Sequence, residues 1–142
     1  MKVAILYICT GKYKFFFKDF YESCEKYFLK DIAEVRYFVF TDDEKLTDAE
    51  NVKIIKKECK GFPMDSLLRF DMFLSLENEL KDFDYTFFFN ANMEFASPIG
   101  EEILPEEEGL AAVMHPGVCR KPWLMYAYDR NKKFTADTKH RA

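Results

Sequence analysis

The stretch Y-T-F-F-F-N-A-N-M-E-F, residues 85–95, constrains the fold most strongly. Its first five residues are apolar or prone to form strands, which is typical of a short strand buried on both faces. Strands of this kind belong to parallel sheets that helices cover on both sides. Asn90-Ala91-Asn92 follows directly, at the point where open α/β sheets bind their ligands. Taken alone, the two asparagines favour an ordinary turn.

Strands and helices alternate along the rest of the chain. The expected strands are residues 3–8, 35–40, 52–55, 85–89 and 110–114. Apolar residues at intervals of three and four predict helices over 15–29 and from about 65 to 80, and Ser97-Pro98 begins a short helical turn through 104. Asp65 or Ser66 is expected to cap the second helix. This alternation predicts right-handed βαβ units and a mainly parallel sheet flanked by helices.

Three polar segments follow predicted strands: Thr10–Tyr13, Asn90–Asn92 and His115–Gly117. The carboxyl ends of parallel strands meet at one edge of a sheet, and ligands of open α/β sheets bind in the crevice at that edge. We therefore expect the three segments to converge on one ligand site, although they are distant in sequence.

Composition limits the class of protein. The 142 residues fit one domain, residues 1–142, and 49% of them are hydrophobic, which is enough for a substantial core. The net charge of −4 provides no basic surface, so nucleic acid is not an expected partner.

The cysteines and the N-terminus point to a reducing compartment. Cys9, Cys24, Cys59 and Cys119 are widely spaced, which fits neither a zinc site nor a disulfide framework. Free thiols are therefore expected. The apolar run at residues 3–8 is too short for a signal sequence or a membrane span. We expect a cytoplasmic protein without a transmembrane segment.

Several single residues have both a structural and a functional interpretation. The segment Thr10-Gly11-Lys12-Tyr13 is not a P-loop and favours an ordinary strand–helix turn, although its amides could contact a phosphate and Tyr13 could stack on a base. Arg69 lies on the apolar side of its predicted helix, where its partner is either a structural carboxylate or a ligand phosphate. His115 is typical of a structural loop residue, or it hydrogen-bonds a sugar hydroxyl.

Asn90 and Asn92 bear on metal chemistry. Many nucleotide-sugar enzymes hold a divalent cation between aspartates and the donor diphosphate, and hard cations prefer charged carboxylates. Amides offer only a neutral carbonyl, so this pair predicts a site without a metal. A diphosphate bound there would need cationic side chains such as Arg69 in place of the metal.

Taken together, the motifs resemble glycosyltransferase family 6, which includes the blood-group A and B transferases and α-1,3-galactosyltransferases, and most of all its bacterial, metal-independent branch. The matching segments are I-C-T-G-K-Y (8–13), Y-F-V-F-T-D (37–42), L-L-R-F-D-M-F (67–73), F-F-F-N-A-N-M-E-F (87–95), S-P-I-G-E-E-I-L-P (97–105) and M-H-P-G-V (114–118). They occur in the family's order, and as a set they are specific.

The resemblance implies the N-terminal, donor-binding portion of a GT-A fold, a Rossmann-like sheet that is mainly parallel. It implies retaining transfer of GalNAc or Gal from a UDP-sugar, in α-1,3 linkage, to a galactose acceptor that bears α-1,2-fucose, without a metal ion or other cofactor. The implied donor-binding residues are Ile8, Cys9, Thr10, Tyr13, Arg69, Asn90, Ala91 and Asn92. The implied acceptor-binding residue is His115.

One departure from the family is large. Its members continue well past residue 142, and the glutamate usually proposed as the catalytic group has no counterpart here. We therefore expect a C-terminally truncated chain whose catalytic residue is unknown. Two alternatives remain: a catalytically incomplete remnant that still binds a UDP-sugar, and an unrelated α/β domain with coincidental motifs.

Overall fold

The structure, a computed structural model, describes residues 1–105 and 109–112. The chain divides into two compact units, Met1–Leu104 and Pro105–Ala142. The first unit contains every strand and helix given below and the pocket described in the next subsection. Within the described residues, no helix has the length and apolar character needed to cross a membrane.

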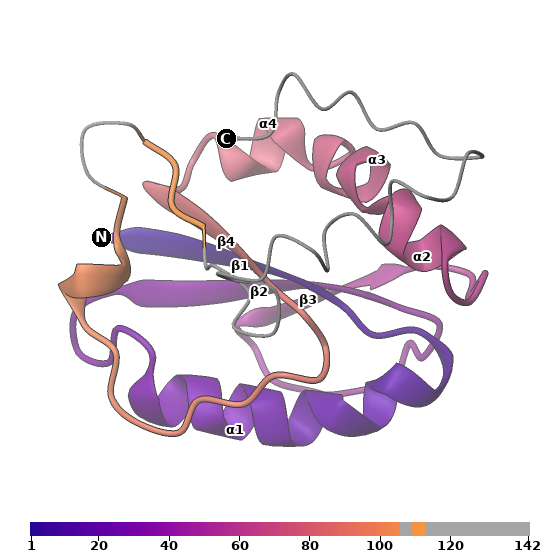
Figure 1. The fold of residues 1–142 in the computed structure, drawn as a ribbon, viewed down its shortest axis with the longest axis horizontal. Coiled ribbons are helices and arrows are strands. Elements are labelled where there is room, and N and C mark those ends of the chain that lie inside the picture. The colour runs from indigo at the N-terminus through magenta and orange to yellow at the C-terminus, as the bar shows by residue number, and fades with distance from the viewer. Residues whose placement is uncertain (106–108, 113–142) are drawn as a thin grey trace, which may run out of the picture. The chain divides into compact units, whose positions relative to one another are not determined.

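A four-stranded parallel sheet forms the centre of the first unit (Figure 1). Its strands are β1 (Lys2–Ile8), β2 (Glu34–Thr41), β3 (Val52–Lys56) and β4 (Tyr85–Phe89), in the order β3-β2-β1-β4. Each pair of neighbours is parallel. The expected α/β class and these expected strands are therefore confirmed.

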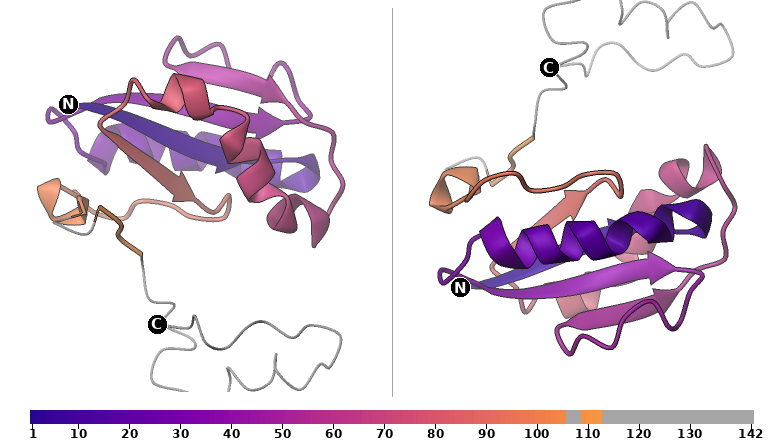
Figure 2. Two further views of the ribbon diagram at one scale, coloured as in Figure 1. Left: turned by 90° about the horizontal axis from the view of Figure 1, so that it is seen from above. Right: turned by 90° about the horizontal axis from the view of Figure 1, so that it is seen from below.

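The order of the strands places helices on both faces of the sheet. The chain runs from β1 outward to β2 and β3, and then returns to β4 on the other side of β1. The 3₁₀ helix η1 (Gly11–Phe16) and α1 (Phe17–Tyr27) follow β1, whereas α2 (Met64–Leu67), α3 (Arg69–Leu74) and α4 (Glu77–Leu80) precede β4. The two groups cover opposite faces, as Figures 1 and 2 show. The chain continues from β1 to one side of the sheet and returns to β4 on the other side. The gap between β1 and β4 is therefore a topological switch point, where sheets of this class bind ligands.

The side chains of β1 alternate between two cores. Ile5 and Tyr7 pack with Phe20 on the α1 side. Ala4 and Leu6 pack with Met72 and Leu76 on the other side. Because both faces are covered, nearly every residue of β1 is buried, which explains the uninterrupted apolar run in the sequence.

The expected helix over 65–80 is wrong as a continuous element, because the structure has three short helices there. Leu68 leaves helical geometry with ψ of 9°, and the Ser75 hydroxyl donates to the Met72 carbonyl at 2.6 Å. Such side-chain bonds compete with the helix backbone. Leu67 and Phe70 belong to the apolar spacing that predicts one continuous helix, but both are exposed in the structure.

Three smaller expectations also change. The helix expected over 15–29 begins at Phe17 because η1 occupies its first turn, and it ends at Tyr27. The helical turn expected over 97–104 is the shorter 3₁₀ helix η2 (Glu101–Ile103). Residues 110–112 are not in a strand, contrary to the strand expected at 110–114, and Leu110 is exposed, whereas a strand requires a paired backbone. Residues 113–114 lie outside the described residues.

Candidate functional site

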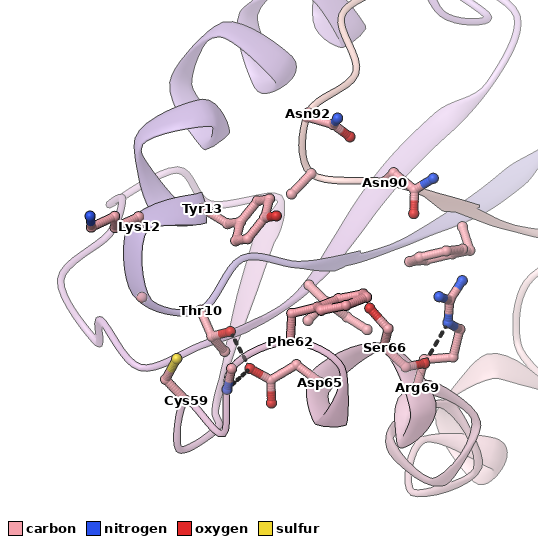
Figure 3. A pocket seen from close by; sticks show the side chains of 15 residues that line it. Thr10, Lys12, Tyr13, Cys59, Phe62, Asp65, Ser66, Arg69, Asn90 and Asn92 are labelled. Carbon is pink, nitrogen blue, oxygen red and sulfur yellow. Dashed lines mark hydrogen bonds between the residues drawn. The ribbon is translucent and has the colours of Figure 1, made fainter. Parts of the chain in front are cut away.

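A pocket lies at the carboxyl ends of β1 and β4, at the switch point of the sheet (Figure 3). Its volume of about 430 Å³ falls in the range of small-molecule sites. Three segments line it: the turn after β1, the loop and first helical turns around residues 59–69, and the end of β4. The lining residues are Ile8, Thr10, Gly11, Lys12, Tyr13, Cys59, Gly61, Phe62, Asp65, Ser66, Arg69, Phe88, Asn90, Ala91 and Asn92.

The structure brings most of the predicted site residues together here. The predicted residues that line the pocket are Ile8, Thr10, Tyr13, Arg69, Asn90, Ala91 and Asn92. Two of the three expected polar segments thus converge as predicted. The third contains His115, which lies outside the described residues.

Cys9 differs from the other predicted site residues, because its side chain is fully buried in the core and does not line the pocket. Its N–H donates to the Phe40 carbonyl at 2.9 Å, and its own carbonyl accepts a hydrogen bond from the Thr41 hydroxyl at 2.9 Å. Alternation explains the difference, since Ile8 and Cys9 are consecutive extended residues and point to opposite sides. Burial raises the pKa of the Cys9 thiol to about 12.

The turn after β1 is held by hydrogen bonds within the protein. The Gly11 N–H donates to Asp42 Oδ1 at 3.0 Å, and the Tyr13 N–H donates to the Thr10 carbonyl at 3.1 Å. These two amides therefore already have partners, contrary to the idea that the turn offers them to a phosphate. The Tyr13 ring, by contrast, is 50% exposed beside the pocket.

Gly11 allows two lining segments to approach closely. Its φ of +57° lies in the left-handed region, and a Cβ added there would lie 3.1 Å from Cys59 Sγ. A side chain at this position would be strained and would push the loop at Cys59 away from the turn. Glycine at position 11 thus keeps these two walls of the pocket in contact.

Arg69 is half-buried and its guanidinium is fixed in place. Its Nε donates to the Ser66 carbonyl at 2.8 Å, and its Cζ lies 5.1 Å from the centre of the Phe88 ring. Within residues 1–105 and 109–112, no carboxylate lies within ion-pair distance of it. The described residues therefore do not supply the structural carboxylate that was one of the two expected partners. Figure 3 shows the guanidinium on the side of the pocket where Asn90 lies.

Hydrogen bonds from the protein core hold the Asn90–Asn92 turn and the segment that follows it. The Tyr7 hydroxyl donates to the Ala91 carbonyl at 2.7 Å, and burial raises the pKa of that hydroxyl, which keeps it neutral and able to donate. Beyond the turn, the N–H of buried Phe95 donates to Ser23 Oγ at 3.2 Å. The side chains of Asn90 and Asn92 are exposed, and no hydrogen bond joins either to another described residue. Their amides are thus available to a ligand.

Asp65 lines the pocket, although the sequence pattern predicted only that it caps a helix. Pattern alone predicted Asp65 or Ser66 as a helix cap, but α2 begins at Met64 after Pro63 and has no side-chain cap. The Asp65 carboxylate instead accepts hydrogen bonds from Thr10, Lys60 and Gly61. Lys12, Cys59 and Phe62 also line the pocket without having been predicted as binding residues. Their place depends on how the loops pack, which no local pattern encodes.

The side chains that line the pocket include few groups that could coordinate a divalent cation. Across the described part of the chain, no group of three or more His, Cys, Asp or Glu side chains is placed to hold a metal ion. At the end of β4 the two asparagines contribute neutral oxygens only, and Asp65, the carboxylate among the lining residues, is engaged by hydrogen-bond donors. Hard cations prefer several charged oxygens, so these residues do not fit such an ion.

Comparison with known proteins gives consistent matches. The model of glycosyltransferase family 6 matches residues 1–139. The O-antigen biosynthesis glycosyltransferase WbnI of Escherichia coli is 39% identical over 137 residues, which cover 95% of this chain and 58% of that protein. The globoside alpha-1,3-N-acetylgalactosaminyltransferase 1 of Homo sapiens is 24% identical over 145 residues, covering 96% and 41%. The protein of the same name in Mus musculus is 26% identical over 147 residues. The chain thus spans about half the length of these relatives.

Proposed function

The chain belongs to glycosyltransferase family 6, and from this premise we propose that its pocket binds the UDP part of a nucleotide-sugar donor. Family membership rules out the alternative of an unrelated domain with coincidental motifs. The sheet and its helices are those of the N-terminal portion of a GT-A-like fold. The observation that carries the proposal is the convergence of an exposed aromatic ring, a guanidinium and two amides on one pocket of suitable size.

In this proposal the turn after β1 receives the base. The Tyr13 ring is half-exposed beside Ile8, so it offers a flat apolar surface on which a uracil can stack. Stacking of a base on an aromatic side chain contributes about 1–3 kcal/mol. Ile8 would contact the edge of the base.

The diphosphate would lie toward Arg69. The guanidinium carries a permanent charge, and the Ser66 carbonyl and the Phe88 ring hold it in place before any ligand binds. Lys12 is an exposed cation on the same pocket lining. Fixed cations stabilise the charge that develops on a leaving diphosphate, because they need no reorganisation during the reaction.

Asn90 and Asn92 would hold the ribose, the diphosphate or the sugar hydroxyls. An amide side chain both donates and accepts hydrogen bonds, which suits hydroxyl groups. The Tyr7 hydrogen bond fixes the turn at Ala91, so the two amides are presented by a rigid backbone. Ala91 would pack against the ribose.

The proposed reaction is transfer of GalNAc or Gal, in α-1,3 linkage and with retention, to a galactose that bears α-1,2-fucose. In the overall reaction the oxygen of the acceptor 3-hydroxyl forms a bond to C1 of the sugar, and the bond from C1 to the β-phosphate oxygen breaks. UDP leaves with the electron pair, and the hydroxyl proton passes to the departing diphosphate. The name of the human relative, an alpha-1,3-N-acetylgalactosaminyltransferase, supports this linkage and sugar. Internal return and double displacement both account for retention. His115 as an acceptor contact and a cytoplasmic location remain predictions.

We also propose that donor binding requires no metal. A divalent cation would need carboxylates where the two asparagines stand, and Arg69 on the same pocket supplies positive charge instead. Replacing both asparagines by aspartate would add two negative charges beside the diphosphate. Such a variant should bind UDP-GalNAc poorly in chelator and regain affinity with Mn²⁺.

Calorimetric titration with UDP-GalNAc, in chelator and again with excess Mn²⁺, tests these points. We expect equal affinity in the two conditions for the unmodified chain, and Mn²⁺-dependent binding for the Asn90→Asp/Asn92→Asp variant. Asn78→Asp, which adds one negative charge on α4 outside the pocket lining, is the control for the effect of added charge away from the site. Binding of the unmodified chain only with Mn²⁺ would contradict metal independence. Binding without turnover of a fucosylated galactoside would instead favour the remnant that binds the donor but does not transfer it.

A further inference from the structure

One carboxylate on the pocket lining connects segments that are far apart in the sequence. Asp65 Oδ2 accepts a hydrogen bond from the Thr10 hydroxyl at 2.8 Å and another from the Gly61 N–H at 3.0 Å. The Lys60 N–H lies 3.2 Å from each carboxylate oxygen. Figure 3 shows the side chains of Thr10 and Asp65 pointing toward each other across the lower wall of the pocket. Asp65 therefore joins the turn after β1 to the loop that precedes α2.

These contacts bear on the shape of the pocket. The loop carries Cys59 and Phe62, which line the pocket, and the Phe62 ring is 86% exposed, so core packing does not hold it. No other hydrogen bond between side chains joins the turn to this loop within the described residues. The close approach of Gly11 to Cys59 Sγ allows the two segments to touch but does not tie them. The position of this wall thus depends on the Asp65 carboxylate.

We propose that Asp65 is a positioning residue for donor binding. Its carboxylate holds the Lys60–Phe62 segment against the turn after β1 and keeps that wall of the pocket formed before the donor arrives. A wall that is already formed favours binding, because no conformational entropy of the loop has to be lost when the donor binds. The identity of the donor rests on the proposed function, but the contacts that hold the wall do not.

The chemistry of the contact calls for a carboxylate. Two backbone N–H groups and one hydroxyl converge on the Asp65 side chain, and an ionised carboxylate accepts on both oxygens. Asp65→Asn keeps the shape but removes the negative charge, and its NH₂ group takes the place of one of the two oxygens that the Lys60 N–H contacts. Hydrogen bonds to charged groups are the stronger kind, so this exchange should release the loop.

The test compares Asp65→Asn with Asp84→Asn. Asp84 Oδ2 also accepts a backbone N–H, that of Lys2 at 2.7 Å, but at the amino-terminal edge of the sheet, away from the pocket. Each variant of the chain is titrated with UDP, and exchange of the Gly61 amide with solvent is measured by NMR without ligand. We expect Asp65→Asn to weaken UDP binding by about 10-fold and to speed Gly61 exchange by a similar factor. Asp84→Asn should change neither quantity.

Thr10→Val provides a second route, since it removes only the hydroxyl donor. If Asp65 acts through Thr10, the double variant Thr10→Val/Asp65→Asn should bind UDP about as weakly as Asp65→Asn alone. If the two residues act independently, the two fold-losses of UDP affinity should multiply. Unchanged UDP affinity or unchanged Gly61 exchange in Asp65→Asn overturns the inference and leaves the proposed function intact. Failure of the unmodified chain to bind UDP overturns the proposed function, and Gly61 exchange still decides whether Asp65 holds the loop. If Asp65→Asn does not fold, Thr10→Val decides by the same two measurements.

Discussion

The residue Tyr13 is half-exposed and lines the pocket, although aromatic residues dominate the core of this protein. We predict that Tyr13→Ala lowers the affinity for UDP by about 10-fold or more, because a stacked base loses roughly 1–3 kcal/mol when its aromatic partner is removed. Phe15→Ala is the matched control, since Phe15 lies on the same helix η1, is 75% exposed and does not line the pocket. Titration with UDP measures both variants. Equal affinities would contradict stacking on Tyr13.

Single residues also mark where sequence patterns lose their power. The place of Asn90 and Asn92 at the pocket was predictable because they directly follow a strand of the parallel sheet. Cys9 was also predicted to bind the donor, but its side chain is buried in the core, because side chains alternate along an extended chain. Asp65 fitted a capping pattern, but its real partners lie on two other segments. The sequence gives the type of each residue directly, but the residues that it contacts depend on segments elsewhere in the chain.

At the scale of elements, Tyr7 connects strand β1 to the turn after β4. Its hydroxyl donates to the Ala91 carbonyl in a buried setting. We predict that Tyr7→Phe lowers the free energy of unfolding by about 1–2 kcal/mol, because it leaves a buried carbonyl without its donor. It should also weaken UDP binding, since the Asn90–Asn92 turn loses its anchor.

The matched control for that change is Tyr21→Phe. The Tyr21 hydroxyl donates to Asn51 Oδ1 at 2.9 Å, and neither residue lines the pocket. This variant should lose stability but keep its affinity for UDP. Chemical unfolding and UDP titration of both variants separate the two effects. If Tyr7→Phe binds UDP as the unmodified chain does, the turn does not depend on this anchor.

The elements themselves were predictable to different degrees. The strands β1 to β4 were, because apolar β-prone runs between polar turns have few alternative structures, whereas the strand expected at 110–114 is not present over 110–112. The helix over 65–80 was not, because its apolar spacing suits one long amphipathic helix. The breaks at Leu68 and Ser75 come from backbone geometry and a side-chain hydrogen bond that periodicity does not express.

At the scale of the whole molecule, buried ionisable groups make stability depend on pH. Burial raises the pKa of the Cys9 and Cys24 thiols from 9.0 to about 12, and it also raises the pKa of the Tyr7 and Tyr37 hydroxyls. The unfolded chain loses these protons first, so it binds fewer protons than the folded chain above pH 9. The stabilisation is fully present below about pH 9 and is lost as pH rises toward 12.

We therefore predict that the free energy of unfolding falls above pH 9 by up to about 1.4 kcal/mol per pH unit for each group. Urea unfolding under reducing conditions at pH 7.5, 9 and 10 measures the slope. Cys24→Ala should flatten it by removing one buried ionisable group, whereas Val39→Ala, which truncates a buried side chain without an ionisable group, should not. Stability that stays constant up to pH 10 would contradict the prediction.

The sequence by itself determined the fold class, the strands β1 to β4 and the polar segments at the ends of two of them. It could do so because burial on both faces of a sheet requires apolar runs, and runs are local. Only the tertiary structure decided that Arg69 faces the pocket without a carboxylate among the described residues, that Asp65 ties the loop to the β1 turn, and that Cys9 is a core residue. These features depend on contacts between segments distant in the chain, and packing of the two helical layers on the sheet fixes those contacts.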